Sequence, residues 1–246
     1  MRIKVLICGL LAAALLLVAA GLPFAPWAMA GAAVIVQVLF AVSWPRLTGA
    51  QTPWLITSVI LLSALGATAA GLVSGPPVTN RHSVEVIACG LLLVFITQVF
   101  RGASAKHRLT TVVSGVAGVT IAVQGVGWVA LGDHRAVLSV TILSLLGLVA
   151  AGALSITRLP DRVVLPVSPV LAGALGAAAT ALPLGLDWVH GLIFGALGGL
   201  VVAVVRALSL TSKAVRSLSG VLAVASCMLL LTGSLNWYAL QLLGGS

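Results

Sequence analysis

Long apolar segments, each separated from the next by only a few polar residues, constrain this chain more than any other feature. A helix needs about 20 apolar residues, with a range of about 17 to 25, to cross the hydrocarbon core of a bilayer. Nine segments meet this length, and the sequence therefore predicts an all-α, polytopic transmembrane helical bundle that forms a single integral membrane domain over residues 1–246. The nine predicted helices are Val5–Leu22, Trp27–Trp44, Trp54–Val73, Val84–Phe100, Leu109–Leu131, Ala136–Thr157, Ser168–Leu186, Val189–Val205 and Leu218–Leu240.

The composition agrees with a surface that faces lipid. Hydrophobic residues make up 61% of the chain and charged residues 7%, whereas soluble domains carry about 25% charged residues. The net charge of +9 would suggest nucleic acid on a soluble protein, but no basic stripe is interleaved with aromatics, so we expect no nucleic-acid partner. Ten of the 13 basic residues are arginine, and Ala, Gly, Val and Leu dominate. This bias is typical of high-GC bacteria such as actinobacteria and favours a multi-pass protein of a bacterial cell membrane.

The basic residues predict the orientation. Cytoplasmic loops of membrane proteins carry an excess of Lys and Arg. With the N-terminus inside and the C-terminus outside, only Arg81 and Arg135 fall outside the cell. The eleven basic residues that fall inside are Arg2, Lys4, Arg46, Arg101, Lys106, Arg108, Arg158, Arg162, Arg206, Lys213 and Arg216.

Two alternatives to nine full crossings remain open. Residues 1–30 have some features of a cleaved signal peptide, with a basic start and small residues at Ala28 and Ala30. The apolar run is longer than usual for a signal peptide, so an uncleaved first helix is favoured. The second alternative concerns Ser168–Leu186 and Val189–Val205, which are separated by two residues and could instead form a re-entrant hairpin.

Arginines near the inner ends of alternate helices suggest a repeated unit. Arg46, Arg101, Arg158 and Arg206 recur at similar spacings, and Ser114-Gly115-Val116 resembles Ser219-Gly220-Val221 at the same distance after its arginine. One leading helix followed by four helical hairpins would account for this pattern. The positive-inside rule alone would also place an arginine at these positions.

Charged and polar residues gather at the predicted outer ends of three helices. Carboxylates there can cap helix N-termini and interact with the helix dipole. This structural role is favoured over an outward-facing site that binds a headgroup, a metal or a partner. We predict no cofactor or metal. The residues of the possible outer polar site are Arg81, His82, Glu85, Asp133, His134, Arg135, Asp187 and His190.

Four amides lie within the predicted membrane span. Gln37, Gln98, Gln124 and Asn236 need hydrogen-bond partners in lipid, so they should face the bundle interior. Hydrogen bonding between helices is favoured, and a polar transport path is the sharper alternative. In the eighth segment, Gly191, Gly195 and Gly199 share one helix face, which predicts close packing against the seventh.

The sequence does not identify a reaction. It contains no P-loop, His-Glu-x-x-His or Gly-x-Ser-x-Gly pattern, and a non-catalytic role is favoured. The first hypothesis is a subunit or scaffold of a membrane or cell-envelope assembly complex. The second is a transporter or flippase-like carrier for a lipid or small apolar solute. The third is an enzyme at the outer surface that uses His82, His134, His190 and the outer carboxylates. Expected partners are other membrane proteins and membrane lipids, with anionic headgroups at the cytoplasmic Arg and Lys residues.

Overall fold

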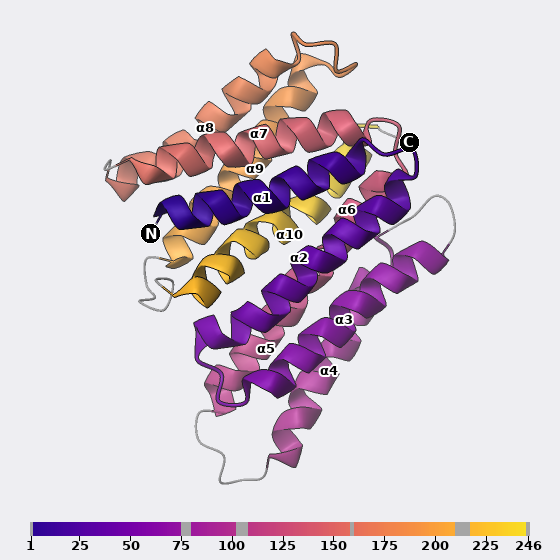
Figure 1. The fold of residues 1–246 in the computed structure, drawn as a ribbon, viewed down its shortest axis with the longest axis vertical. Helices are drawn as coiled ribbons and strands as arrows, with labels where there is room; N and C mark the ends of the chain where they lie inside the picture. Colours follow the sequence, from indigo (N-terminus) through magenta and orange to yellow (C-terminus); the bar gives the residue numbers. More distant parts are fainter. Residues whose placement is uncertain (1, 75–79, 102–107, 158–159, 210–216, 245–246) are drawn as a thin grey trace.

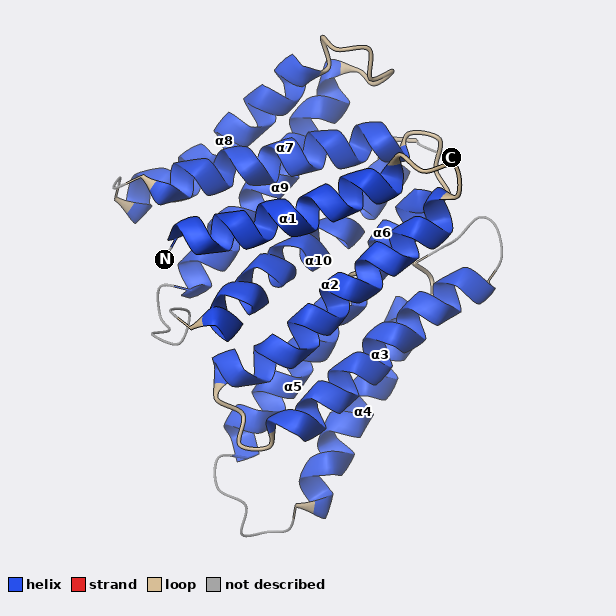
Figure 2. Ribbon diagram, viewed as in Figure 1, coloured by secondary structure: helices blue, strands red, loops and turns tan. Residues whose placement is uncertain are grey.

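The computed structural model of the protein describes residues 2–74, 80–101, 108–157, 160–209 and 217–244, and every regular element in them is a helix (Figure 2). The basic residues Lys106, Arg158, Lys213 and Arg216 lie outside the described residues. The helices are α1 (Arg2–Ala20), α2 (Ala25–Thr48), α3 (Pro53–Val73), α4 (Ser83–Phe100), α5 (Arg108–Val123), α6 (Val126–Gly132), α7 (Val137–Ile156), α8 (Asp161–Ala179), α9 (Trp188–Ser209) and α10 (Leu218–Leu242).

The helices form the predicted polytopic membrane bundle. Eight segments of the described chain are long and apolar enough to cross a bilayer, with α5 and α6 together forming one of them, and α1 is a shorter apolar helix. Successive segments run in opposite directions, so that α1 begins at one end of the bundle and α10 finishes at the other (Figure 1). We name these ends by the orientation that the arginines predict, with Arg46 and Arg101 at the inner end.

α1 and α10 lie between two groups of helices. α7, α8 and α9 pack together on one side, and α2 to α6 form the group on the other (Figure 1). α10 contacts α1, α2, α6 and α9, which makes it the central helix of the bundle. Its buried residues include Leu230 and Leu240, whereas α4 and α8 at the two edges expose most of their apolar side chains.

The chain also fits a description as one helix and four hairpins. α2 packs against α3, α4 against α5, α7 against α8, and α9 against α10. Each pair therefore consists of consecutive segments that lie side by side.

The bounds of α8 differ from the sequence prediction by seven residues at each end. The helix begins at Asp161, directly after Pro160, and contains Pro166 and Pro169. A proline inside a helix removes one backbone hydrogen bond, which is why the sequence placed most of this helix between Pro169 and Pro183. After Ala179 the chain turns through Gly185, whose φ of 67° suits glycine. α8 and α9 are both long enough to cross the membrane, so the re-entrant alternative is not needed.

α8 and α9 pack with their backbones close together. A Cβ atom added to Gly191 or Gly195 would collide with the carbonyl oxygens of Gly176 and Ala172 of α8. A Cβ atom on Gly199 would lie 2.7 Å from the Cα atom of Pro169. Glycine is required at this interface because no larger side chain fits between the two helices.

A broken transmembrane helix as candidate functional site

The segment predicted as one continuous helix over Leu109–Leu131 is interrupted between α5 and α6. Gln124 and Gly125 separate the two helices, and the backbone there forms tighter bonds between residues three apart. Glycine weakens a helix interior, and the sequence has two glycines at this point, Gly125 and Gly127. Four backbone amides each donate to the carbonyl oxygen three residues before, at 3.1–3.2 Å. The pairs are Gln124 with Ile121, Gly125 with Ala122, Gly127 with Gln124, and Trp128 with Gly125.

Gln37 of α2 supports the break from one side. Its side chain is fully buried, and Nε2 donates a 3.1 Å hydrogen bond to the carbonyl oxygen of Ala122. The hydroxyl of Thr68 on α3 donates to Gln37 Oε1 at 3.2 Å. The amide packs closely, because a Cβ atom on Gly125 would lie 2.7 Å from Gln37 Nε2. Gln37 therefore joins α2, α3 and α5 through contacts within the protein.

Ser234 of α10 supports the break from the other side. Its hydroxyl donates a 2.9 Å hydrogen bond to the carbonyl oxygen of Gln124. Asn80, before α4, donates from Nδ2 to Ser234 Oγ at 3.1 Å, and Asn80 Oδ1 accepts from the hydroxyl of Ser83. All three of these side chains are buried. This chain of bonds connects the start of α4 to the centre of the bundle.

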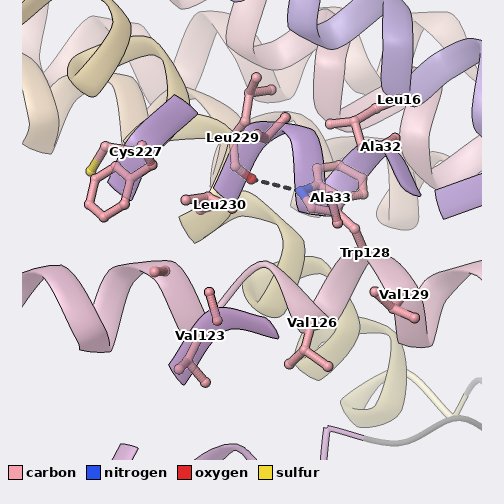
Figure 3. Close-up of a cluster of buried hydrophobic side chains, with 14 of the residues drawn as sticks. Leu16, Ala32, Ala33, Val123, Val126, Trp128, Val129, Cys227, Leu229 and Leu230 are labelled. Carbon is pink, nitrogen blue, oxygen red and sulfur yellow. Dashed lines mark hydrogen bonds between the residues drawn. The ribbon is translucent and has the colours of Figure 1, made fainter. Parts of the chain in front are cut away.

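Trp128 fixes α6 against α10. Its indole Nε1 donates a 2.7 Å hydrogen bond to the carbonyl oxygen of Leu229, as the dashed line in Figure 3 shows. Leu16 of α1 and Ala33 of α2 lie near the ring (Figure 3). Gly233 faces the indole, and a Cβ atom there would lie 2.6 Å from the ring. α6, the outer part of the broken segment, is therefore held by packing as well as by polar contacts.

Asn236 lies two residues beyond Ser234 on α10 and differs from the other amides. It is fully buried, and within the described part of the chain neither of its side-chain polar atoms has a hydrogen-bond partner. The hydroxyls of Thr141 and Ser144 on α7 are also buried without partners in the described residues. Buried polar atoms of this kind favour the binding of water or of a polar ligand group.

Gln98 and Gln124 occupy different levels of the bundle, as expected from their positions. Gln124 is half-buried at the break, where its carbonyl oxygen accepts from Ser234. Gln98 is buried near the inner end of α4, where its side chain accepts a 2.9 Å hydrogen bond from Arg101. Gln37 and Gln124 thus both lie at the break, whereas Gln98 belongs to a separate network at the inner end. The role of the intramembrane amides as a path stays a prediction.

The outer polar residues belong to three separate turns. His82 Nδ1 lies 2.7 Å from Glu85 Oε2 in the first turn of α4, next to the exposed Arg81. His134 Nδ1 accepts the backbone amide of Ala136 between α6 and α7, where Asp133 and Arg135 are exposed. His190 lies on α9 beside Phe194, after the exposed Asp187. Among the residues that the structure describes, no three His, Cys, Asp or Glu side chains gather as a metal site would require.

Several residues of the central network were not singled out by sequence analysis. Thr68, Ser83 and Ser234 are small hydroxyl residues of a type that is common in membrane helices. Only the two closely spaced glycines after Gln124 could have indicated a break in the segment. The side chains that donate to the carbonyls at the break come from helices distant in sequence, and local patterns do not reveal them.

Comparison with known protein families finds no matching family model, and comparisons with curated proteins and with solved structures find no match either.

Proposed function

We propose that this protein is a non-catalytic subunit or scaffold of a multi-protein complex in a bacterial cell membrane. The observation that carries the proposal is the use of its intramembrane polar groups. Gln37, Ser234 and Trp128 all donate hydrogen bonds to backbone carbonyls of this chain, and these bonds stabilise the fold itself. A bundle organised in this way acts through the surfaces it presents to its neighbours in the membrane.

The shape of the bundle supports this role. α4 and α8 form opposite edges of the molecule (Figure 1), and both helices expose most of their apolar side chains. Exposed large side chains on α4 include Leu92, Phe95 and Phe100. In a complex, such edges can pack against other transmembrane helices, where van der Waals contact drives association.

The test is purification of the tagged full-length protein from its native membrane in a mild detergent, after crosslinking in intact cells. We expect one or more other membrane proteins at a fixed stoichiometry, recovered again when the partner carries the tag. An unrelated multi-pass protein with the same tag and expression level serves as the control. Recovery of this chain alone, with no protein crosslinked to it at a level above that of the control, would contradict the proposal.

A carrier for a lipid or small apolar solute is the second candidate function. The broken segment between α5 and α6 favours it, because interrupted helices in the middle of a membrane form binding sites in many transporters. Asn236 adds a buried amide with no partner in the described residues, two positions beyond Ser234 on α10.

Reconstitution distinguishes the second candidate from the first. Purified protein in vesicles should accelerate the transbilayer movement of a fluorescent phospholipid if the protein is a flippase-like carrier. Asn236→Leu should then reduce the rate, whereas Gln241→Leu, at an exposed position on the same helix, should not. Movement no faster than in protein-free vesicles, with correctly folded protein, rules against a phospholipid carrier.

A further inference from the structure

Two arginines at the inner end of the bundle bind the same glutamine. Arg101, which follows α4, donates from Nη1 to Gln98 Oε1 at 2.9 Å. Arg108, the first residue of α5, donates from Nη2 to the backbone oxygen of Gln98 at 3.2 Å. Thr111 is fully buried beside them, with its Oγ1 atom 3.5 Å from Arg101 Nη1. We call Gln98, Arg101, Arg108 and Thr111 the inner arginine cluster.

The cluster has an excess of positive charge that the carboxylates of the chain do not balance. The chain has four acidic residues. Glu85, Asp133 and Asp187 belong to the outer end, and Asp161 pairs with Arg206 through contacts of 2.5 and 3.0 Å. Two guanidinium groups that contact one residue repel each other, and an anion beside both would remove that repulsion.

The side chain of Gln98 points to the same conclusion. Gln98 is 6% exposed, and in the described residues its Nε2 atom is buried without an acceptor. Its Oε1 atom already accepts from Arg101, so the remaining group of the amide is a donor. A buried donor without an acceptor is costly, and this one belongs to a residue that two cationic side chains contact. A ligand that matches these groups therefore supplies acceptors and negative charge.

The surroundings of the cluster indicate the source of that anion. Val99, Phe100 and Leu109 flank it and are more than 70% exposed, at 75%, 86% and 77%. Such apolar side chains face acyl chains in a membrane. A ligand at this position thus has an anionic head at the arginines and an apolar tail along α4 and α5. Basic pockets between membrane helices bind phospholipid headgroups in this way.

We propose that the inner arginine cluster is a binding site for the phosphate of one anionic phospholipid. Arg101 and Arg108 provide charge-assisted hydrogen bonds to the phosphate oxygens, and Gln98 Nε2 donates to a third acceptor position. The N-terminus of α5, which begins at Arg108, adds a favourable dipole. This inference is independent of the function proposed above.

The test uses the full-length protein reconstituted in vesicles of equal parts phosphatidylglycerol and phosphatidylcholine. The protein is then extracted in mild detergent, and native mass spectrometry measures the mass of the protein with its bound lipid. We expect one phosphatidylglycerol retained per chain. Arg101→Gln with Arg108→Gln should weaken its binding by about 25-fold or more, since each arginine near a lipid surface contributes roughly fivefold. The matched control is Lys4→Gln with Arg46→Gln, two exposed residues at the same end, which should keep the bound lipid.

A third variant keeps the test decisive if the double arginine variant does not fold. Gln98→Glu introduces a carboxylate between the two arginines and should displace the lipid, while the protein melts at the wild-type temperature or higher without lipid. Equal loss of lipid from the cluster and control variants, or full retention in Gln98→Glu, would overturn the proposal. Displacement of the lipid by millimolar inorganic phosphate would show a site for free phosphate and would also overturn it.

Discussion

At the scale of single residues, close contact between backbones decides which positions tolerate change. Gly127 of α6 faces the backbone of Ser234 on α10, and a Cβ atom there would collide with the Ser234 amide nitrogen. Gly66 of α3 is also helical, but an added Cβ atom would meet nothing within 4 Å. The two glycines look alike in sequence and differ only in what lies opposite them.

Gly127→Ala is therefore expected to destabilise the protein by roughly 1–3 kcal/mol, the usual cost of overpacking, because the neighbouring atoms belong to the backbone. Gly66→Ala should leave stability unchanged or raise it slightly. Unfolding of both variants in detergent, followed by tryptophan fluorescence, measures the difference. Equal midpoints for the two variants would show that α6 and α10 are not in close contact.

Gln37 is a second residue whose role is decided by its partners. Gln37→Leu removes the bonds to Ala122 and Thr68 and should lower stability by about 0.5–2 kcal/mol, the range for hydrogen bonds between membrane helices. Gln241→Leu, at an exposed position, is the control and should have little effect. A detergent-denaturation series on both variants provides the measurement, and an unaffected Gln37→Leu protein would contradict the supporting role at the break.

At the scale of elements, one arginine joins the inner ends of three helices. Arg206 of α9 is nearly buried, with a side-chain exposure of 7%, and it pairs with Asp161 at the start of α8. Its Nη1 atom also donates to the carbonyl oxygen of Ser155 near the end of α7 at 3.2 Å. A buried charge needs such partners, since removing one leaves the other uncompensated.

Asp161→Asn should consequently cost about 1–3 kcal/mol of stability, less than for a fully buried pair because the Asp161 side chain is 40% exposed. Arg206→Gln in the Asp161→Asn background should cost less than Arg206→Gln in the wild type. Arg162→Gln, at the exposed neighbouring position, serves as the control. Additive effects in this double-mutant cycle, measured by thermal unfolding, would mean that the pair contributes nothing.

At the scale of the whole molecule, the eight long apolar segments of the described chain and the shorter α1 predict nine crossings, with the two ends of the chain on opposite sides of the membrane. In a variant whose natural cysteines are replaced by alanine, Ser246→Cys should react with an impermeant maleimide added to intact cells. Gln51→Cys, in the exposed turn between α2 and α3 at the inner end, should react only after the membrane is opened. Protection of Ser246→Cys in intact cells would contradict the odd number of crossings.

Helix number and alternation followed from the sequence because a bilayer demands one property that is local in the chain, a long apolar run. The described helices agree with eight of the nine predicted segments to within a few residues at each end, and α8 differs because its first turns accommodate prolines. The glycines of α9 and the buried amides were visible as residue types, but their partners were not.

The tertiary structure alone decided the break between α5 and α6, the bonds from Gln37 and Ser234 to its carbonyls, and the meeting of Arg101 and Arg108 at Gln98. The Gln37 bond joins residues 85 positions apart, and the Ser234 bond joins residues 110 positions apart. In lipid every backbone polar group requires a partner, but the chain supplies that partner from whichever helix lies alongside. Apolar length therefore determined how often this protein crosses the membrane, and only helix packing decided where its polar groups act.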